Sequence, residues 1–124
     1  MPSHISPALA RLLPDSAMLS DDDELLLAGH RLASIAQEYG TPLYIFDHAT
    51  IVNACVRYRE AFQTYYHASR VHSIYASKAY LSPLIAHLMH EQEMGLDVVS
   101  GGELAVAQRA NFPMSQICFH GNNK

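Results

Sequence analysis

The apolar and polar positions after residue 70 divide into two kinds of segment. Short apolar runs rich in β-forming residues, at 71–77, 96–99 and 116–120, predict strands. The runs between them, 82–94 and 103–110, predict helices. This alternation with short connections is typical of parallel βαβ units with right-handed crossovers.

Capping residues mark the helix boundaries in this region. Ser82 followed by Pro83 predicts a helix start, because serine caps the first turn and proline suits its first position. Gly95 is expected to end that helix. The run "SGGE" matches a capping box in which Ser100 is the cap and Glu103 reaches back to the free amides.

The pattern before residue 70 is less regular. Residues 1–40 are expected to form a lead-in with short helices, the last of which closes at Gly40. The run "TPLYIF" at 41–46 predicts a strand. From Ala49 to about Tyr65, apolar residues recur at helical spacing and predict an amphipathic helix, which Asp47 caps.

Composition and charge exclude several function classes. The 124 residues are 49% hydrophobic and 16% charged, which fits one soluble globular unit, and the scattered basic residues indicate no nucleic-acid partner. The acidic run at 21–24 is expected to be a solvated turn. We expect free thiols at Cys55 and Cys118, because they lie in apolar stretches without the spacing of metal ligands, and we expect no metal site in the chain. We also expect no membrane partner and a cytoplasmic location, because neither a long apolar run nor a secretory signal is present.

Polar residues follow each of the three predicted strands. Lys78 ends the first strand, Ser100 follows the second, and His120 follows the third. The C-terminal ends of parallel strands share one edge, where barrels and open α/β sheets build their sites. The three clusters therefore predict a common site.

Lys78 is the candidate nucleophile at this edge. Its small neighbours Ala76, Ser77 and Ala79 would leave room for a ligand. Partial desolvation would then favour the neutral amine that Schiff-base formation needs. The alternative is an exposed lysine at a strand end, without chemistry.

The other candidates at this edge each have a structural alternative. Asp97 is the one charge inside an apolar strand and is costly to bury unless paired, which favours a functional or networked role. Glu103 is explained by the capping box, and His120 is equally explained as a polar strand end.

A helical group of His87, His90 and Glu91 has spacings of three and four residues. It lacks the His-Glu-x-x-His arrangement of helical zinc sites. We therefore expect a solvated helix face there, and no metal site.

Four short motifs resemble those of a known family. They are "GTPLYIFD", "YASKAY", "GLDVVSGGEL" and "HGNNK", in this order over residues 40 to 124. Together they resemble the N-terminal part of the diaminopimelate decarboxylases, which are pyridoxal-phosphate enzymes of the alanine-racemase-like fold. One position departs from the family pattern, since Tyr80 stands where many members have asparagine.

The resemblance implies an α/β fold class, the N-terminal portion of an alanine-racemase-like (β/α)8 TIM barrel that is incomplete in this chain. Residues 1–40 would be the lead-in, and residues 41–124 the first βα units of the cofactor-binding barrel. The family's phosphate loop and second, β-rich domain are expected beyond residue 124, so the chain alone is expected to be inactive.

The resemblance also implies roles for individual residues. Lys78 would bind pyridoxal 5′-phosphate covalently and act in catalysis, and the other residues implied to line the cofactor pocket are Asp97, Ser100, Glu103, His120 and Asn122. The implied reaction is the decarboxylation of meso-2,6-diaminopimelate to L-lysine and carbon dioxide, the last step of lysine biosynthesis, by a homodimer acting on an amino-acid substrate.

Two alternatives remain open. One is another decarboxylase of the same fold, acting on ornithine, arginine or carboxynorspermidine. The other is a non-catalytic, truncated remnant that binds the cofactor weakly or associates with a homologous subunit.

Overall fold

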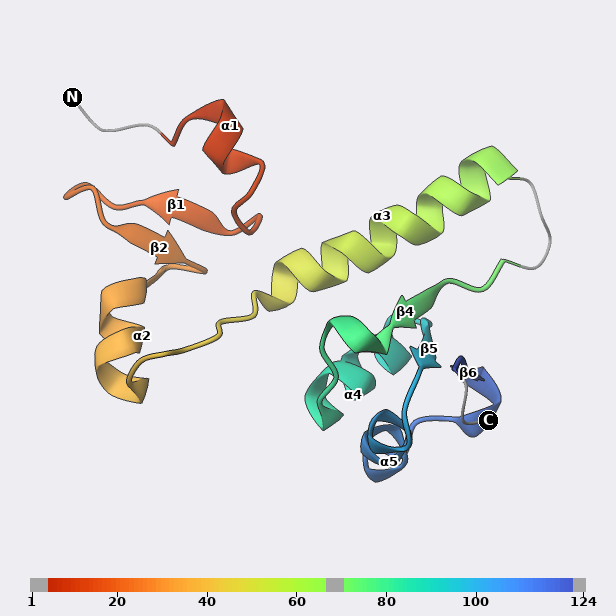
Figure 1. Ribbon diagram of the computed structural model, residues 1–124. Coiled ribbons are helices and arrows are strands. Elements are labelled where there is room, and N and C mark those ends of the chain that lie inside the picture. The colour runs from red at the N-terminus through yellow and green to blue at the C-terminus, as the bar shows by residue number, and fades with distance from the viewer. Residues whose placement is uncertain (1–4, 67–70, 122–124) are drawn as a thin grey trace. The chain divides into compact units, whose positions relative to one another are not determined.

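The computed structural model describes residues 5–66 and 71–121. The chain divides into two compact units, Met1–Asn53 and Ala54–Lys124. Figure 1 traces the helices and strands of each unit.

The first unit contains a small antiparallel sheet that was not predicted from the sequence. Its elements are α1 (Pro7–Ala10), β1 (Ala17–Leu19), β2 (Leu25–Leu27), β3 (His30–Arg31) and α2 (Leu32–Tyr39), with the sheet order β1-β2-β3. Strands of two or three residues are too short to show an alternating pattern. The short helices are confirmed, and α2 closes at Gly40, which has a φ of 83°.

The acidic run at 21–24 forms an exposed turn between β1 and β2, as predicted. The Ser20 amide donates to the Glu24 carbonyl at 2.9 Å. Arg31, at the end of β3, pairs with Asp22 at 2.8 Å and also contacts the Glu24 carboxylate. The hydrogen bonds from Arg31 and Ser20 lower the pKa of Asp22 to about 2.

The strand predicted at 41–46 is wrong. This segment has no regular secondary structure, and no strand within residues 5–66 and 71–121 pairs with it. A strand needs ladder hydrogen bonds from a neighbouring strand, however favourable its own residues are. Without that neighbour its apolar side chains stay exposed, and the side chain of Tyr44 is 89% exposed.

The helix α3 (His48–Tyr66) confirms the amphipathic helix expected from the sequence. Asp47 caps it by accepting a hydrogen bond from the Thr50 amide at 3.2 Å, and its carboxylate also receives the Thr50 hydroxyl. The hydrogen bonds from Thr50 lower the pKa of Asp47. The packing is less complete than expected, because Cys55 is buried but Phe62 remains 42% exposed.

The second unit is the parallel α/β structure that the sequence predicted. Its elements after α3 are β4 (Ile74–Ala76), the 3-10 turn η1 (Ser77–Ala79), α4 (Pro83–Glu91), β5 (Gly95–Val98), α5 (Gly101–Arg109), the 3-10 turn η2 (Met114–Gln116) and β6 (Ile117–Phe119). The strands pair in the order β4-β5-β6 and are all parallel.

The core of this unit lies between one face of the sheet and the helices α4 and α5, which pack on each other in Figure 1. Leu96 and Val98 of β5 are fully buried, and Met89 of α4 is 2% exposed. Successive side chains of a strand point to opposite faces, so Asp97 lies on the face away from this core. The polar candidate is therefore presented on the side of the sheet that the helices leave open.

Two boundaries differ from the prediction. The helix α4 ends at Glu91, and Glu93 has a φ of 57°, so Gly95 does not end the helix. Gly95 instead begins β5, where a Cβ atom would lie 2.8 Å from the Gln116 carbonyl oxygen. The first strand is also shorter than predicted, since the chain leaves β4 for η1 at Ser77.

Over the described residues, no helix combines the length and apolar character needed to span a bilayer. The two cysteines, Cys55 and Cys118, are free thiols, as expected.

Candidate functional site

The strand-to-helix connections that frame the site are capped as predicted. The Ser82 hydroxyl accepts a hydrogen bond from the Ile85 amide at 3.2 Å. The Ser100 hydroxyl accepts one from the Glu103 amide, also at 3.2 Å. The Glu103 carboxylate in turn accepts a hydrogen bond at 2.7 Å from the amide of Val99, the residue before the cap. The Glu103 carboxylate therefore fixes the connection between β5 and α5.

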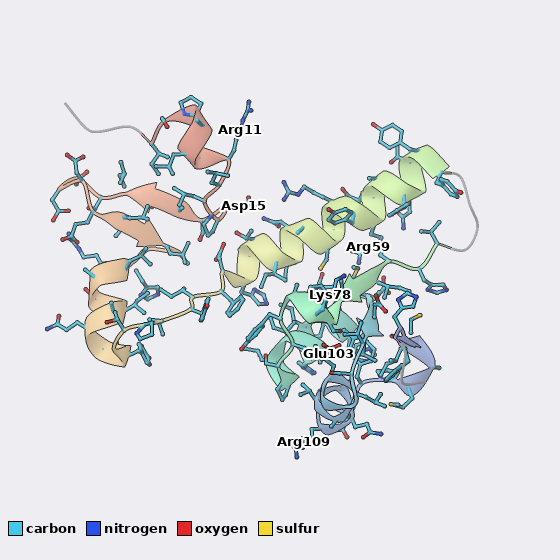
Figure 2. The ribbon with its side chains drawn as sticks, in the orientation of Figure 1. Arg11, Asp15, Arg59, Lys78, Glu103 and Arg109 are labelled. Atoms are coloured by element: carbon cyan, nitrogen blue, oxygen red, sulfur yellow. The ribbon has the colours of Figure 1, made fainter. Side chains whose placement is uncertain are left out.

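Lys78 lies in η1, directly after the C-terminal end of β4 (Figure 2). The Tyr75 hydroxyl donates to the Tyr80 carbonyl at 2.8 Å, which closes the backbone around the lysine. Burial raises the pKa of the Tyr75 phenol. The turn is therefore held from within the second unit, and it presents the lysine at the edge of the sheet.

The desolvation expected for Lys78 is absent in the described part of the chain, where its side chain is exposed. Its neighbour Ser77 is 2% exposed, and the Ser77 hydroxyl has no hydrogen-bond partner among residues 5–66 and 71–121. At this turn Ser77 is therefore the buried residue, and the amine of Lys78 stays accessible.

Asp97 and His120 form a pair at the same edge. His120 Nδ1 lies 2.7 Å from Asp97 Oδ1, and their side chains are 63% and 24% exposed. The His120 amide donates to the Val98 carbonyl at 2.8 Å, which continues the pairing of β5 and β6 beyond Phe119. When protonated, the His120 imidazole would be the partner that a charge inside a strand requires.

The loop after His120 is held close to the end of β5. Gly121 has a φ of 134°, and a Cβ atom there would lie 3.2 Å from the Val99 carbonyl oxygen. Glycine is needed for both the backbone conformation and the close approach. The backbone at Gly121 therefore lies close to the end of β5.

The structure places several of the predicted site residues at one edge of the sheet and gives two of them a capping role. Lys78, Asp97 and His120 all lie at the C-terminal edge of the parallel sheet. Ser100 and Glu103 lie at the same edge but serve the cap of α5, whose first turn carries Glu103 in Figure 2. Asn122 lies outside the described residues.

Cys118 is a member of this edge that the sequence did not single out. It pairs in register with Asp97, and its sulfur belongs to a group with Asp97 and His120 whose ligand atoms all lie within 4.8 Å of one another. Its position two residues before His120 was the available signal, because residues i and i+2 of a strand share a face.

The chain is similar to known proteins in sequence and in structure. The family described as "Pyridoxal-dependent decarboxylase, pyridoxal binding domain" matches residues 48–124. Proteins named diaminopimelate decarboxylase match from Mycobacterium tuberculosis, 38% identical over 98% of this chain and 25% of the relative, and from Bacillus subtilis, 46% identical over 73% and 20%.

Solved structures of diaminopimelate decarboxylases also match this chain. A diaminopimelate decarboxylase from M. jannaschii in complex with L-lysine is 32% identical, with a TM-score of 0.76 over 87% of this chain and 25% of that one. This chain therefore spans about a quarter of the length of the proteins that it matches.

Proposed function

This chain belongs to the pyridoxal-dependent decarboxylase family, and we propose that it forms the lysine-bearing part of a pyridoxal-phosphate site. The observation that supports this most directly is the exposed amine of Lys78 at the C-terminal edge of three parallel strands, the edge that also carries the Asp97–His120 pair. Site-forming residues of parallel α/β folds gather at this edge.

The residues present fit the cofactor. The accessible amine of Lys78 can bond to its carbonyl carbon, and Ala76, in register with Asp97, leaves the face beside it open. When bound, pyridoxal phosphate supplies an electron sink for the charge left by a departing carboxylate. Within this chain, Asp97 Oδ1 and His120 Nδ1 lie 2.7 Å apart at the same edge, where they would line the cofactor site.

Ser100, Glu103 and Asn122 have less direct roles in this proposal. Ser100 and Glu103 keep the β5–α5 connection in place through their cap hydrogen bonds. For Asn122, which lies outside the described residues, the proposal of a place in the cofactor pocket rests on the family resemblance alone.

For the whole protein we propose decarboxylation of meso-2,6-diaminopimelate to L-lysine and carbon dioxide. The names of the relatives and the lysine complex of the M. jannaschii protein support this substrate over ornithine, arginine or carboxynorspermidine. We also propose a homodimer, and a cytoplasmic location that fits the two free thiols. A non-catalytic remnant is the competing reading.

Borohydride reduction in the presence of pyridoxal phosphate tests the role of Lys78. The chain has two lysines, Lys78 and Lys124, so the second is an internal control. Peptide mass spectrometry should find the reduced adduct on Lys78, and it should persist in Lys124→Arg and disappear in Lys78→Arg. Equal labelling of both lysines, or no labelling of Lys78, would contradict the proposal.

The reaction itself is tested in a protein that joins this chain to the remaining length of the family fold. Carbon dioxide release should be fastest with meso-2,6-diaminopimelate and should be lost in Lys78→Arg. Faster release from ornithine, arginine or carboxynorspermidine would assign a different substrate. Labelling of Lys78 without carbon dioxide release from any of the four would support the remnant.

A further inference from the structure

Three side chains with different metal-binding atoms meet on the open face of the parallel sheet. They are the carboxylate of Asp97, the thiol of Cys118 and the imidazole of His120, whose ligand atoms all lie within 4.8 Å of one another. We propose that this cluster binds a divalent cation of borderline softness, with Zn²⁺ as the best match. The cluster shares Asp97 and His120 with the edge proposed above for the cofactor, but the inference rests on the three donor atoms and is tested without the cofactor.

The backbone of two paired strands positions the three ligands. Asp97 of β5 lies opposite Cys118 of β6 in parallel register, and His120 follows two residues later. The hydrogen bond from the His120 amide to the Val98 carbonyl keeps that spacing beyond the end of β6. A site carried by strands holds its donors more accurately than one carried by loops.

The distances suit a zinc ion after a small adjustment. Zinc bonds of about 2.0–2.3 Å in a tetrahedron separate neighbouring ligand atoms by about 3.3–3.6 Å. Asp97 Oδ1 and His120 Nδ1 are 2.7 Å apart, so this pair would open by less than about 1 Å. The pairs that include the Cys118 sulfur lie within 4.8 Å and would close by at most about 1.5 Å. Oδ1 of Asp97 is buried and receives no aligned hydrogen bond from the described residues, so a cation would satisfy it.

The types of donor decide which cations fit. Thiolate and imidazole favour zinc and similar ions, whereas magnesium and calcium prefer oxygen ligands throughout. Three protein ligands leave a fourth position for water, because His120 is largely exposed on this face.

The helical group considered from the sequence is a weaker candidate and serves as a control. His87 and Glu91 lie 3.2 Å apart on the exposed face of α4. His90 instead makes an edge contact with Phe112, with ring centroids 5.7 Å apart. The three residues are therefore not assembled around one point.

Isothermal titration calorimetry of the 124-residue chain with Zn²⁺, in the absence of pyridoxal phosphate, tests the proposal. We expect one ion per chain, and Cys118→Ser should weaken binding at least about tenfold, since even supporting residues of zinc sites contribute about 10–100-fold. With Co²⁺ in place of Zn²⁺, the thiolate-to-metal charge-transfer band should appear and should be absent in Cys118→Ser. The matched controls Cys55→Ser and His87→Asn should leave both signals unchanged.

His120→Gln is the decisive variant, because its side chain is mostly exposed and its loss leaves the sheet intact. The proposal is wrong if this variant binds Zn²⁺ as tightly as the unmodified chain, or if His87→Asn is the variant that loses binding. Circular dichroism checks that each variant is folded. Borohydride labelling of Lys78 without metal is a separate result, so the two proposals can fail independently.

Discussion

Replacement of Gly95 by alanine tests how closely β5 and β6 approach at their N-terminal ends. The added Cβ would lie 2.8 Å from the Gln116 carbonyl oxygen and 3.4 Å from Cγ1 of Ile74. The oxygen belongs to the backbone and cannot rotate away, so the strands must separate by about 0.6 Å to reach ordinary contact. The Gly95 amide also donates to the Ser73 carbonyl at 2.9 Å, so the shift disturbs β4 as well.

The expected cost follows from two opposing effects. Overpacking of this kind costs about 1–3 kcal/mol. The lower entropy of alanine in the unfolded chain offsets about 0.5–1 kcal/mol of it. We therefore expect Gly95→Ala to lower the free energy of unfolding of the second unit by about 1–2 kcal/mol, roughly a tenfold change in its folding equilibrium.

Gly102→Ala is the matched control. Gly102 lies in the first turn of α5, where an added Cβ would meet only the Ser100 hydroxyl at 3.8 Å. Alanine favours helix over glycine, so this variant should be neutral or more stable by up to about 1 kcal/mol.

Amide hydrogen exchange is the suitable assay, with urea unfolding followed by circular dichroism beside it, because exchange reports on each of the two compact units residue by residue. Gly95→Ala should reduce protection of the β5 amides at 96–98, and Gly102→Ala should not. Unchanged protection in Gly95→Ala, with loss in Gly102→Ala, would refute the close approach of the two strands.

Three further predictions concern stability. Ser100→Ala should cost about 0.5–2 kcal/mol, because the Glu103 amide loses its acceptor; an unchanged urea midpoint would contradict this. Leu96→Ala should cost about 2–5 kcal/mol by the same assay, because the side chain is fully buried, and a cost below that of Ser100→Ala would argue against this core. The pairing of Asp22 with Arg31 lowers the pKa of Asp22 from 3.8 to about 2, so its contribution is complete above pH 3.8 and is lost as the pH falls through about 2. An NMR titration of the first unit should show this loss in the unmodified chain and not in Asp22→Asn.

Much of the local structure could be predicted from the sequence. Ser82, Ser100 and Asp47 cap the helices expected after them, and all three act through hydrogen bonds to residues three positions ahead. Interactions of that range are encoded in a few neighbouring residues. The order of strands and helices after residue 70 follows from equally local patterns.

The prediction failed where a segment depends on a distant partner. The apolar run at 41–46 has the residues of a strand but no neighbouring strand in the described ranges, whereas the short runs of β1, β2 and β3 pair into a sheet. The sequence predicts a helix end at Gly95 because glycine is common there. Its actual reason is the carbonyl of Gln116, which is 21 residues away (116 − 95).

The candidate site shows the same division. Lys78, Asp97 and His120 were identified from their positions at strand ends, since that placement depends only on the order of elements. Cys118 joined them only through the parallel register that sets it opposite Asp97. Local composition decides which element each residue occupies, but hydrogen bonds between strands decide which side chains meet, because register is a property of two segments and is not contained in either one.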